Sequence, residues 1–334
     1  MPRVVFQQHR RGKPLWTSCA GLRRVIEARD PQAVPAALEQ LWQEASAGRV
    51  AAGFVCYEAA PAMDEALAAH RPGWLPLVWF GVVDGAVEDA QPPADNAQPP
   101  ADNAQPPADD GHPPADDGHP LADNVQPPAD NAQPPQIGPW QPAISREQYD
   151  RSIRQIKEYI AAGHTYQVNY TFPLRAEIIG PAWPLFLRMC RAQQAEYCAY
   201  IETDEFAVCS ASPELFFQLD GRRIISRPMK GTSRRGRSSE EDLALRTALR
   251  NCPKNRAENA MIVDMVRNDL GRIAARRSVQ VCSAFDVEIY PTVLQLTSTV
   301  AAETDASFVY ILRALFPPAS VNVAPEVRTT EIIR

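Results

Sequence analysis

The sequence predicts an α+β fold, in which layered and largely antiparallel β-sheets are flanked by helices. Apolar strand-like segments follow one another across short turns, as in residues 196–231 and again in residues 278–303. Segments with helical spacing of apolar residues interrupt these hairpins at irregular intervals and do not alternate with single strands. This mixed order is typical of antiparallel sheets whose helices gather on one face.

Residues 1–89 are predicted to form a small α/β subregion of this fold. Residues 3–8 are expected to be a strand, and residues 30–48 a helix with an acidic start and a glycine stop. Two apolar strands are expected to follow, at residues 50–60 and 75–85.

A seven-residue repeat occupies residues 90–136 and separates two regions of ordinary composition. Its units, such as AQPPADN, contain eight aspartates and neither lysine nor arginine. Two prolines in most units exclude a continuous helix, and almost no apolar side chain is available for burial. We therefore predict a disordered insertion of partly polyproline II character, and we assign it no binding function.

The third region, residues 137–334, begins with a clear helix. Ser145 lies at the cap position, Gly163 ends the helix, and four apolar residues keep helical spacing between them: Tyr149, Ile153, Ile156 and Ile160. A strand is expected directly after Gly163. The later elements are strands at 196–203, 205–221 and 222–231, helices at 238–252 and 255–276, paired strands at 278–303, and a helix at 307–319 that runs into a proline-rich loop.

Composition and charge argue against nucleic-acid and membrane partners. The formal net charge is −6, but the eight aspartates of the repeat exceed it, so the rest of the chain is close to neutral and offers no extended basic footprint. No apolar run is long enough to span a bilayer, and the N-terminus lacks a signal-peptide pattern. The seven cysteines are scattered without C-x-x-C spacing, which predicts reduced thiols and a cytoplasmic protein.

Positive charge is concentrated around Lys230, at a point where a strand is expected to stop and turn. Basic residues crowd this part of the sequence: Arg222, Arg223, Arg227, Lys230, Arg234, Arg235 and Arg237. A solvated basic loop is one interpretation, favoured for the last three arginines. A nucleic-acid patch is disfavoured because no aromatic residues interleave with the charges, whereas a small anionic substrate suits a local cluster on a near-neutral chain.

Two carboxylates are candidates for chemistry. Glu214 precedes the run from Leu215 to Phe217, a setting in which a carboxyl can act as a general acid, although a surface turn explains it equally well. Glu258 lies near the start of an expected helix. It is either a charge that complements the helix dipole or a ligand for a hard divalent cation such as Mg²⁺, and spacing does not separate the two.

Five motifs occur in the order and approximate spacing of the chorismate-utilising enzymes: SPELFF, SRPMKGTSRRG, NRAENAMIVDMVRNDLG, YPTVLQLTSTV and ALFPPASVNVAPEVRTTEIIR. The chain resembles this family, which includes anthranilate synthase, isochorismate and salicylate synthases, and component I of aminodeoxychorismate synthase. The segments GFVCYEAAP and LPLVWFG resemble the bacterial aminodeoxychorismate synthase branch. In that branch the central loop reads PIKGT, with lysine where anthranilate synthases carry alanine. The resemblance implies a fold of the anthranilate and aminodeoxychorismate synthase type.

The resemblance implies that Lys230 is a nucleophile. It would attack C2 of chorismate and expel the C4 hydroxyl, after which ammonia adds at C4 and gives 4-amino-4-deoxychorismate, a precursor of 4-aminobenzoate and folate. Attack requires a neutral amine, whereas a lysine in water is almost wholly protonated at neutral pH. Burial and a neighbouring cation such as Arg227 are expected to favour the neutral form.

By the same resemblance, Glu214 corresponds to the general acid that protonates the leaving hydroxyl, and Glu258 to a ligand of Mg²⁺. Gly231, Thr232 and Ala324 correspond to substrate-binding positions. Because no glutaminase signature occurs in the chain, the ammonia is expected to come from a separate glutamine amidotransferase subunit.

The last motif departs from the family pattern F-P-x-G-S-x-T-G-A-P-K. Ala319 and Val323 replace glycines, Asn322 replaces threonine, and Glu326 replaces lysine. Val323 adds a β-branched side chain where backbone must approach a substrate carboxylate, and Glu326 adds negative charge where a dianion should bind. The family also continues beyond the position of Arg334 with strands and a glycine-rich loop.

Two interpretations from different classes therefore stand. The chain is an aminodeoxychorismate synthase component I, or it is a catalytically inactive remnant that acts at most as a binding module. Isochorismate, salicylate or anthranilate synthesis is a weaker alternative. Since the family's last segments do not occur in this sequence, we expect a fold that is incomplete at the C-terminus and a chain that is inactive as given.

Overall fold

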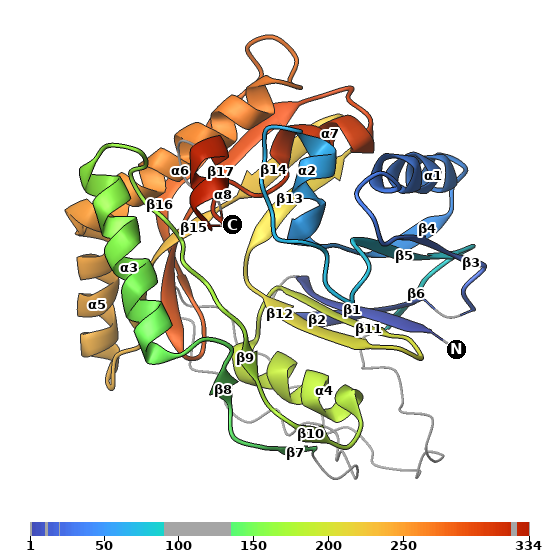
Figure 1. Ribbon diagram of the computed structural model, residues 1–334, viewed down its shortest axis with the longest axis horizontal. Helices are drawn as coiled ribbons and strands as arrows, with labels where there is room; N and C mark the ends of the chain where they lie inside the picture. The colour runs from blue at the N-terminus through green and yellow to red at the C-terminus, as the bar shows by residue number, and fades with distance from the viewer. Residues whose placement is uncertain (1, 11–12, 20, 90–134, 322–325, 334) are drawn as a thin grey trace, which may run out of the picture.

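The computed structural model describes residues 2–10, 13–19, 21–89, 135–321 and 326–333, arranged as antiparallel sheets with helices on their faces (Figure 1). The helices are α1 (Val34–Ser46), α2 (Ala60–Met63), α3 (Arg146–Ala161), α4 (Ala182–Gln193), α5 (Ser239–Asn251), α6 (Pro253–Gly271), α7 (Phe308–Leu315) and α8 (Glu326–Ile333), with a 3₁₀ turn at Tyr57–Ala59. The strands are β1 (Arg3–Arg10), β2 (Lys13–Cys19), β3 (Arg24–Ala28), β4 (Val50–Val55), β5 (Val78–Val83), β6 (Val87–Asp89), β7 (Gln136–Ile137), β8 (Gln141–Pro142), β9 (Leu174–Arg175), β10 (Ile178–Ile179), β11 (Tyr197–Glu202), β12 (Ala207–Ser212), β13 (Leu215–Asp220), β14 (Arg223–Arg227), β15 (Met229–Arg234), β16 (Gln280–Ile289) and β17 (Val293–Glu303).

Three sheets organise the described chain. One has the order β12-β11-β1-β2-β6, a second β3-β5-β4, and a third β13-β14-β17-β15 with β16 also paired to β17. Every pairing between the described strands is antiparallel, which confirms the predicted α+β class. Because β1 pairs with β11, the N-terminal segment shares a sheet with strands that follow the repeat.

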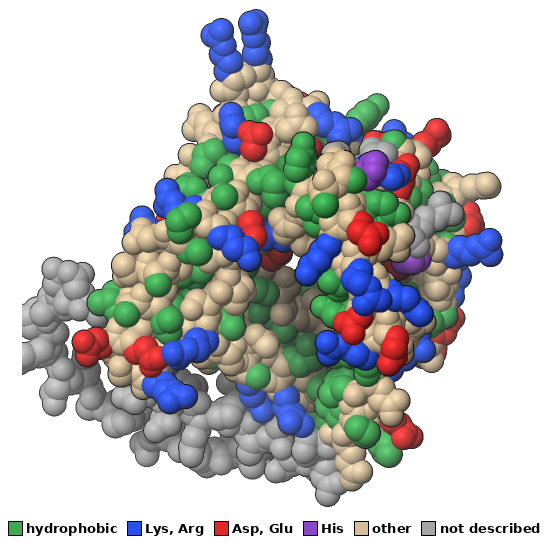
Figure 2. Space-filling view, turned by 60° about the vertical axis from the view of Figure 1, so that its left-hand side comes forward, with side chains coloured by type: hydrophobic (Ala, Val, Ile, Leu, Met, Phe, Trp, Pro, Cys, Tyr) green, Lys and Arg blue, Asp and Glu red, His purple; other side chains and the backbone are tan. Residues whose placement is uncertain are grey.

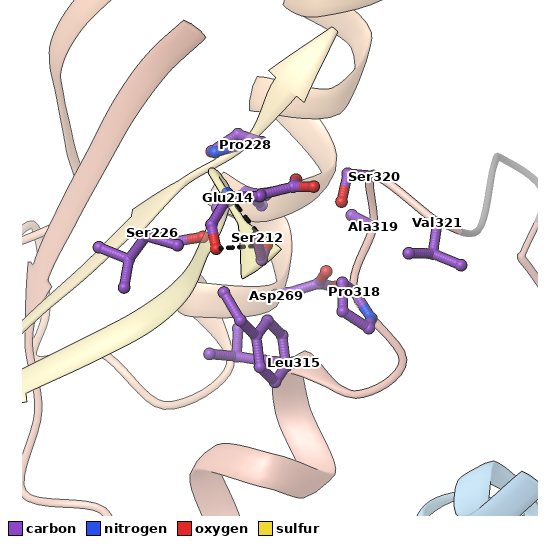
Figure 3. A pocket seen from close by; sticks show the side chains of 13 residues that line it. Ser212, Glu214, Ser226, Pro228, Asp269, Leu315, Pro318, Ala319, Ser320 and Val321 are labelled. Carbon is purple, nitrogen blue, oxygen red and sulfur yellow. Dashed lines mark hydrogen bonds between the residues drawn. The ribbon is translucent and has the colours of Figure 1, made fainter. Parts of the chain in front are cut away.

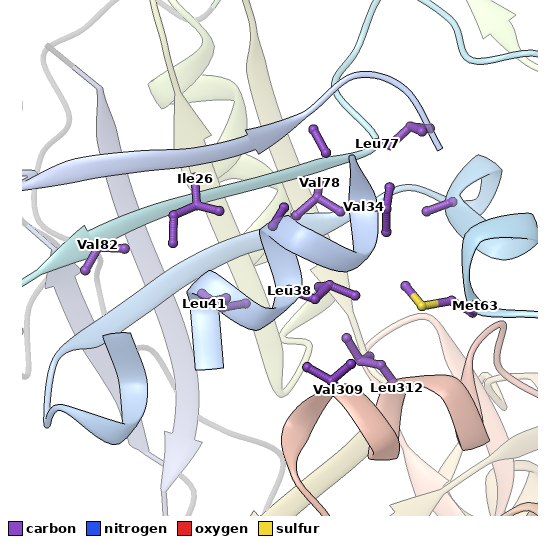
Figure 4. Close-up of a cluster of buried hydrophobic side chains, with 13 residues drawn as sticks. Ile26, Val34, Leu38, Leu41, Met63, Leu77, Val78, Val82, Val309 and Leu312 are labelled. Carbon is purple, nitrogen blue, oxygen red and sulfur yellow. The ribbon is translucent and has the colours of Figure 1, made fainter. Parts of the chain in front are cut away.

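The third sheet and the helices on it carry the site. Helix α6 packs against β15 and β17, and helix α7 follows β17 in the chain. Ile311 and Leu315 of α7 join α6 residues in one hydrophobic cluster, whereas Val309 and Leu312 pack with α1 and β5 in another (Figure 4). Helix α7 therefore joins two cores, and this fixes the direction in which the chain leaves it toward Ser320.

Most predicted elements are present. The strand expected after Gly163 is reduced to the short β9 and β10, and the sequence did not indicate the helices α2, α4 and α8. Ser145 caps α3 in a capping box with Gln148, as the cap residue predicts. Helix α4 follows Pro181 and has Pro184 in its first turn, where proline is tolerated, so a segment that resembles a loop is helical. Helix α8 occupies the region expected to be a proline-rich loop.

The sequence expectations for the repeat and for the start of the first helix have different outcomes. The predicted disordered insertion lies almost wholly outside the described residues, and its last residue, Gln136, pairs with Ile179 in the described part. The acidic start expected for the first helix lies before it, because Asp30 accepts a hydrogen bond from Ala33 N (3.0 Å) and α1 begins at Val34. None of the helices within the described ranges is long and apolar enough to cross a membrane.

Candidate active site

Lys230 lies on a β-bulge in β15. Met229 is opposite Thr297 and Thr232 is opposite Gln295, so two residues of β15, Lys230 and Gly231, face one residue of β17. Gly231 has φ of +108°, a conformation open to glycine and strained for other residues. The strand that was expected to stop at this lysine therefore continues through it, with a local bend that redirects the lysine side chain.

The ammonium group of Lys230 reaches two oxygen atoms from distant parts of the chain. Its Nζ lies 3.4 Å from Asn169 Oδ1 and 3.2 Å from the carbonyl oxygen of Ser320. Asn169 in turn donates from Nδ2 to the carbonyl oxygens of Ser320 (3.1 Å) and Val321 (2.8 Å). The half-buried lysine is thus held between the segment that follows α3 and the loop that follows α7.

The surroundings of Gly231 leave little room for a side chain. An added Cβ would lie 3.2 Å from Asn255 Cβ and 3.2 Å from Leu296 Cβ, and the positive φ adds strain. We expect Gly231→Ala to lower the free energy of unfolding by about 1–3 kcal/mol, measured by urea denaturation. The control is Gly271→Ala at the end of α6, where nothing lies within 4 Å of an added Cβ. Equal stabilities of the two variants would contradict the requirement for glycine at the bulge.

Glu214 lies between β12 and β13 and contacts the first residue of β15. Its backbone N–H donates to Ser212 Oγ (3.2 Å), and its Oε1 accepts a hydrogen bond from the backbone N–H of Met229 (3.4 Å). Because Met229 precedes Lys230, Glu214 contacts the backbone next to the predicted nucleophile. This long hydrogen bond leaves the carboxyl free to serve another partner.

A cavity of about 200 Å³ opens beside Glu214. Figure 3 shows Ser212, Glu214 and Ser226 on one side of it, with Ala319, Ser320 and Val321 on the other. Ser320 connects this cavity to Lys230, since its carbonyl oxygen accepts the lysine hydrogen bond. The position of Ala319 is compatible with its substitution for glycine, because the methyl group is buried in the cluster that α6 and α7 share.

A wider groove of about 1120 Å³ adjoins the same loop. It is lined by Asn169, Tyr170, Ser320 and Val321, and on α3 by Ile156 and Tyr159. The face in Figure 2 is hollowed near its centre, with basic side chains on the rim. Ser320 and Val321 line both hollows, so the loop after α7 separates a small cavity from an open groove.

Arg227 does not act on Lys230 as an uncompensated cation. Its guanidinium forms ion pairs with Glu196 and with Glu288, the latter at 3.4 Å. Burial alone would lower the pKa of Arg227, but the carboxylates of Glu288 and Glu196 raise it above its ordinary value. The expectation that this arginine favours a neutral Lys230 is therefore not supported, because two carboxylates compensate its charge.

The described residues supply one carboxylate at the predicted metal position. Glu258 is half-buried on α6, and its Oε1 lies 3.9 Å from Nζ of Lys254. Asp269, which lines the small cavity, is eleven residues further along the same helix, or about 16 Å along its axis. No group of three or more possible metal ligands occurs within the described ranges. A Mg²⁺ ion at Glu258 would need its other ligands from substrate and water, which is usual for this ion.

The predicted substrate-binding residues have different surroundings. Gly231 forms the bulge, and Thr232 is exposed, with its hydroxyl donating to Gln295 Oε1 (3.0 Å). Ala324 lies outside the described residues, as do Asn322 and Val323. Asn169 and Ser320 were missed by the sequence analysis, because no spacing or composition signal distinguishes a residue that reaches the site through tertiary contacts.

Sequence similarity relates the chain to enzymes of known activity. The family model described as chorismate binding enzyme matches residues 5–334. Aminodeoxychorismate synthase component 1 of Klebsiella aerogenes is 45% identical over 196 residues, covering 58% of this chain and 44% of that protein. The same component of Escherichia coli (strain K12) is 41% identical over 196 residues, covering 58% and 43%. Anthranilate synthase component 1 of Aquifex aeolicus is 34% identical over 196 residues, covering 58% and 40%. The chain spans about half the length of the curated relatives it matches.

Solved structures share the fold at low identity. A putative isochorismate synthase from Bacillus anthracis has a TM-score of 0.69 at 16% identity, covering 99% of this chain and 76% of that one. Anthranilate synthase component I from Streptococcus pneumoniae has a TM-score of 0.67 at 20% identity, covering 99% and 76%. These likenesses confirm the predicted fold type, and the family match extends over almost the whole sequence. The chain belongs to the chorismate-binding enzyme family.

Proposed function

We propose that this chain is an aminodeoxychorismate synthase component 1, which converts chorismate and ammonia to 4-amino-4-deoxychorismate for 4-aminobenzoate and folate synthesis. The observation that carries the proposal is the position of Lys230. Its side chain leaves a β-bulge and lies between Asn169 and Ser320, while Glu214 contacts the preceding residue and lines the adjoining cavity. The names of the curated relatives support the same activity.

Each bond that forms or breaks in the proposed reaction is assigned to Lys230, Glu214 or ammonia. The neutral amine of Lys230 forms a bond to C2 of chorismate as the bond from C4 to its hydroxyl breaks. Glu214 gives a proton to the departing hydroxyl, which leaves as water. Ammonia then forms a bond to C4 as the bond between C2 and the amine of Lys230 breaks. The proton lost by the new ammonium group at C4 restores Glu214, and the free amine of Lys230 is ready for the next turnover.

Positioning and charge neutralisation complete the proposal. Glu258 would hold Mg²⁺, which when bound supplies positive charge for the ring carboxylate of chorismate. The backbone at Gly231 and Thr232, with Ala324, would contact the substrate. The loop from Ala319 to Val321 forms one wall of the small cavity.

The ammonia would come from a separate glutamine amidotransferase subunit, as the designation "component 1" of the relatives suggests. The seven cysteines are all unpaired, which suits a reducing compartment, and we place the protein in the cytoplasm.

The activity is tested with the purified chain, chorismate, Mg²⁺ and an ammonium salt, with products separated by liquid chromatography and identified by mass spectrometry. Because Lys230, Glu214 and Glu258 are all present, we expect 4-amino-4-deoxychorismate that requires both ammonium and Mg²⁺, in place of the inactivity expected from the sequence alone. Anthranilate, isochorismate or salicylate as the main product would replace the proposal with another activity of the family. Chorismate binding by calorimetry without any product would instead favour the binding-module interpretation.

A further inference from the structure

We propose that the buried pair Asn259 and Ser298 positions Lys230 for its reaction, by holding the β-bulge from the side of helix α6. The inference deepens the proposed function, because it explains how the amine of Lys230 is held at one place. Asn259 lies one helical turn beyond Asn255, and both face the bulge. It touches the backbone of Lys230, not its amine, and is therefore a positioning residue.

The bulge interrupts the hydrogen-bond ladder between β15 and β17, and Asn259 supplies a side-chain donor to the backbone there. Between the pairs Met229–Thr297 and Thr232–Gln295 the ladder is interrupted. Asn259 Nδ2 donates to the carbonyl oxygen of Leu296 (3.3 Å) and, at 3.5 Å, to that of Lys230. One side-chain amide thus connects the two strands where the ladder cannot.

Ser298 fixes the orientation of this amide. Its Oγ donates to Asn259 Oδ1 (2.5 Å) and accepts from the backbone N–H of Phe285 on β16 (3.1 Å). Asn259 is 1% exposed and Ser298 is not exposed at all, so water does not compete for these hydrogen bonds. The chain of contacts runs from β16 through Ser298 and Asn259 to Lys230, and it sets which end of the amide faces the bulge.

The same turn of α6 carries the proposed metal ligand and contacts the bulge that carries the proposed nucleophile. Asn255 would contact a Cβ at Gly231, Asn259 bonds to the carbonyl of Lys230, and Glu258 lies between them in the sequence. A shift of this turn would therefore move the proposed metal ligand and the nucleophile together. Cavity-lining Asp269 lies on a later turn of α6.

The test uses Ser298→Ala, Asn259→Ala and the double variant. Misplacement of a reacting group by about 1 Å can cost a hundredfold in rate. We expect kcat for aminodeoxychorismate formation to fall about ten- to hundredfold in each single variant, with KM for chorismate little changed. The double variant should be no worse than Asn259→Ala, because the two side chains act as one unit. The matched control is Asn268→Ala, an exposed asparagine on the same helix.

A second measurement reports on Lys230 without turnover. The chain has four lysines, so acetylation by an N-hydroxysuccinimide ester can be followed at each by peptide mass spectrometry. The rate at Lys230 should change in Ser298→Ala and Asn259→Ala, while the rate at exposed Lys157 stays as in the wild-type protein.

Failure of the wild-type protein to aminate chorismate would count against the proposed function and leave this readout intact. Folded variants with a lower melting temperature but unchanged kcat and unchanged labelling of Lys230 would overturn the inference. If Asn259→Ala does not fold, Ser298→Ala decides between these outcomes.

Discussion

Lys230→Ala is expected to abolish formation of 4-amino-4-deoxychorismate, because the variant has no amine to attack C2. Alanine occupies this position in anthranilate synthases, so some addition of ammonia at C2 is expected to remain. The fold should persist, since the removed side chain contributes two long hydrogen bonds at a half-buried site. The measurement is product analysis by mass spectrometry after incubation with chorismate, Mg²⁺ and ammonium, with the melting temperature recorded alongside.

Lys157→Ala serves as the control, because Lys157 is an exposed lysine on α3. It should retain wild-type rates and products. Wild-type rates of 4-amino-4-deoxychorismate formation in Lys230→Ala would remove the nucleophile assignment. The proposed site would then have to act by direct addition of ammonia.

Glu214→Gln is expected to lower kcat by about 10²–10⁴-fold, the range of general acid catalysis. Glutamine keeps the shape of the side chain, and its amide oxygen can still accept the hydrogen bond from Met229 N. It has no proton to give to the leaving hydroxyl. The melting temperature should therefore stay near the wild-type value while turnover falls, as measured in the ammonium-dependent assay.

Asp269→Asn provides the matched comparison, because Asp269 is a second carboxylate in the lining of the same cavity. We expect a smaller loss of kcat, since Asp269 lies on α6, whereas Glu214 contacts the strand that carries Lys230. A larger loss in Asp269→Asn than in Glu214→Gln would transfer the general acid role to Asp269.

Local sequence signals determined the secondary structure wherever the responsible interactions lie within a few residues. Ser145 and Gln148 form a capping box within one turn of α3, and this predicted where the helix begins. The apolar stripe of α3 indicated a helix correctly, although no residue of α3 is buried, because periodicity reports amphipathic character and not the partner that covers it. The five ordered motifs, one of which contains Lys230, were likewise sufficient to predict the family.

The arrangement of the site was decided by tertiary structure. Lys230 meets Asn169 and Ser320, which are 61 and 90 residues away in sequence. Arg227, close to Lys230 in sequence, is instead paired with Glu196 and Glu288. Proximity in sequence indicates which residues belong to one strand, but the registers of β14 and β15 on β17 decide which side chains meet. Composition and spacing carry no record of those registers. The sequence by itself therefore predicted Lys230 as the nucleophile, while only the folded chain placed Asn169 and Ser320 beside it.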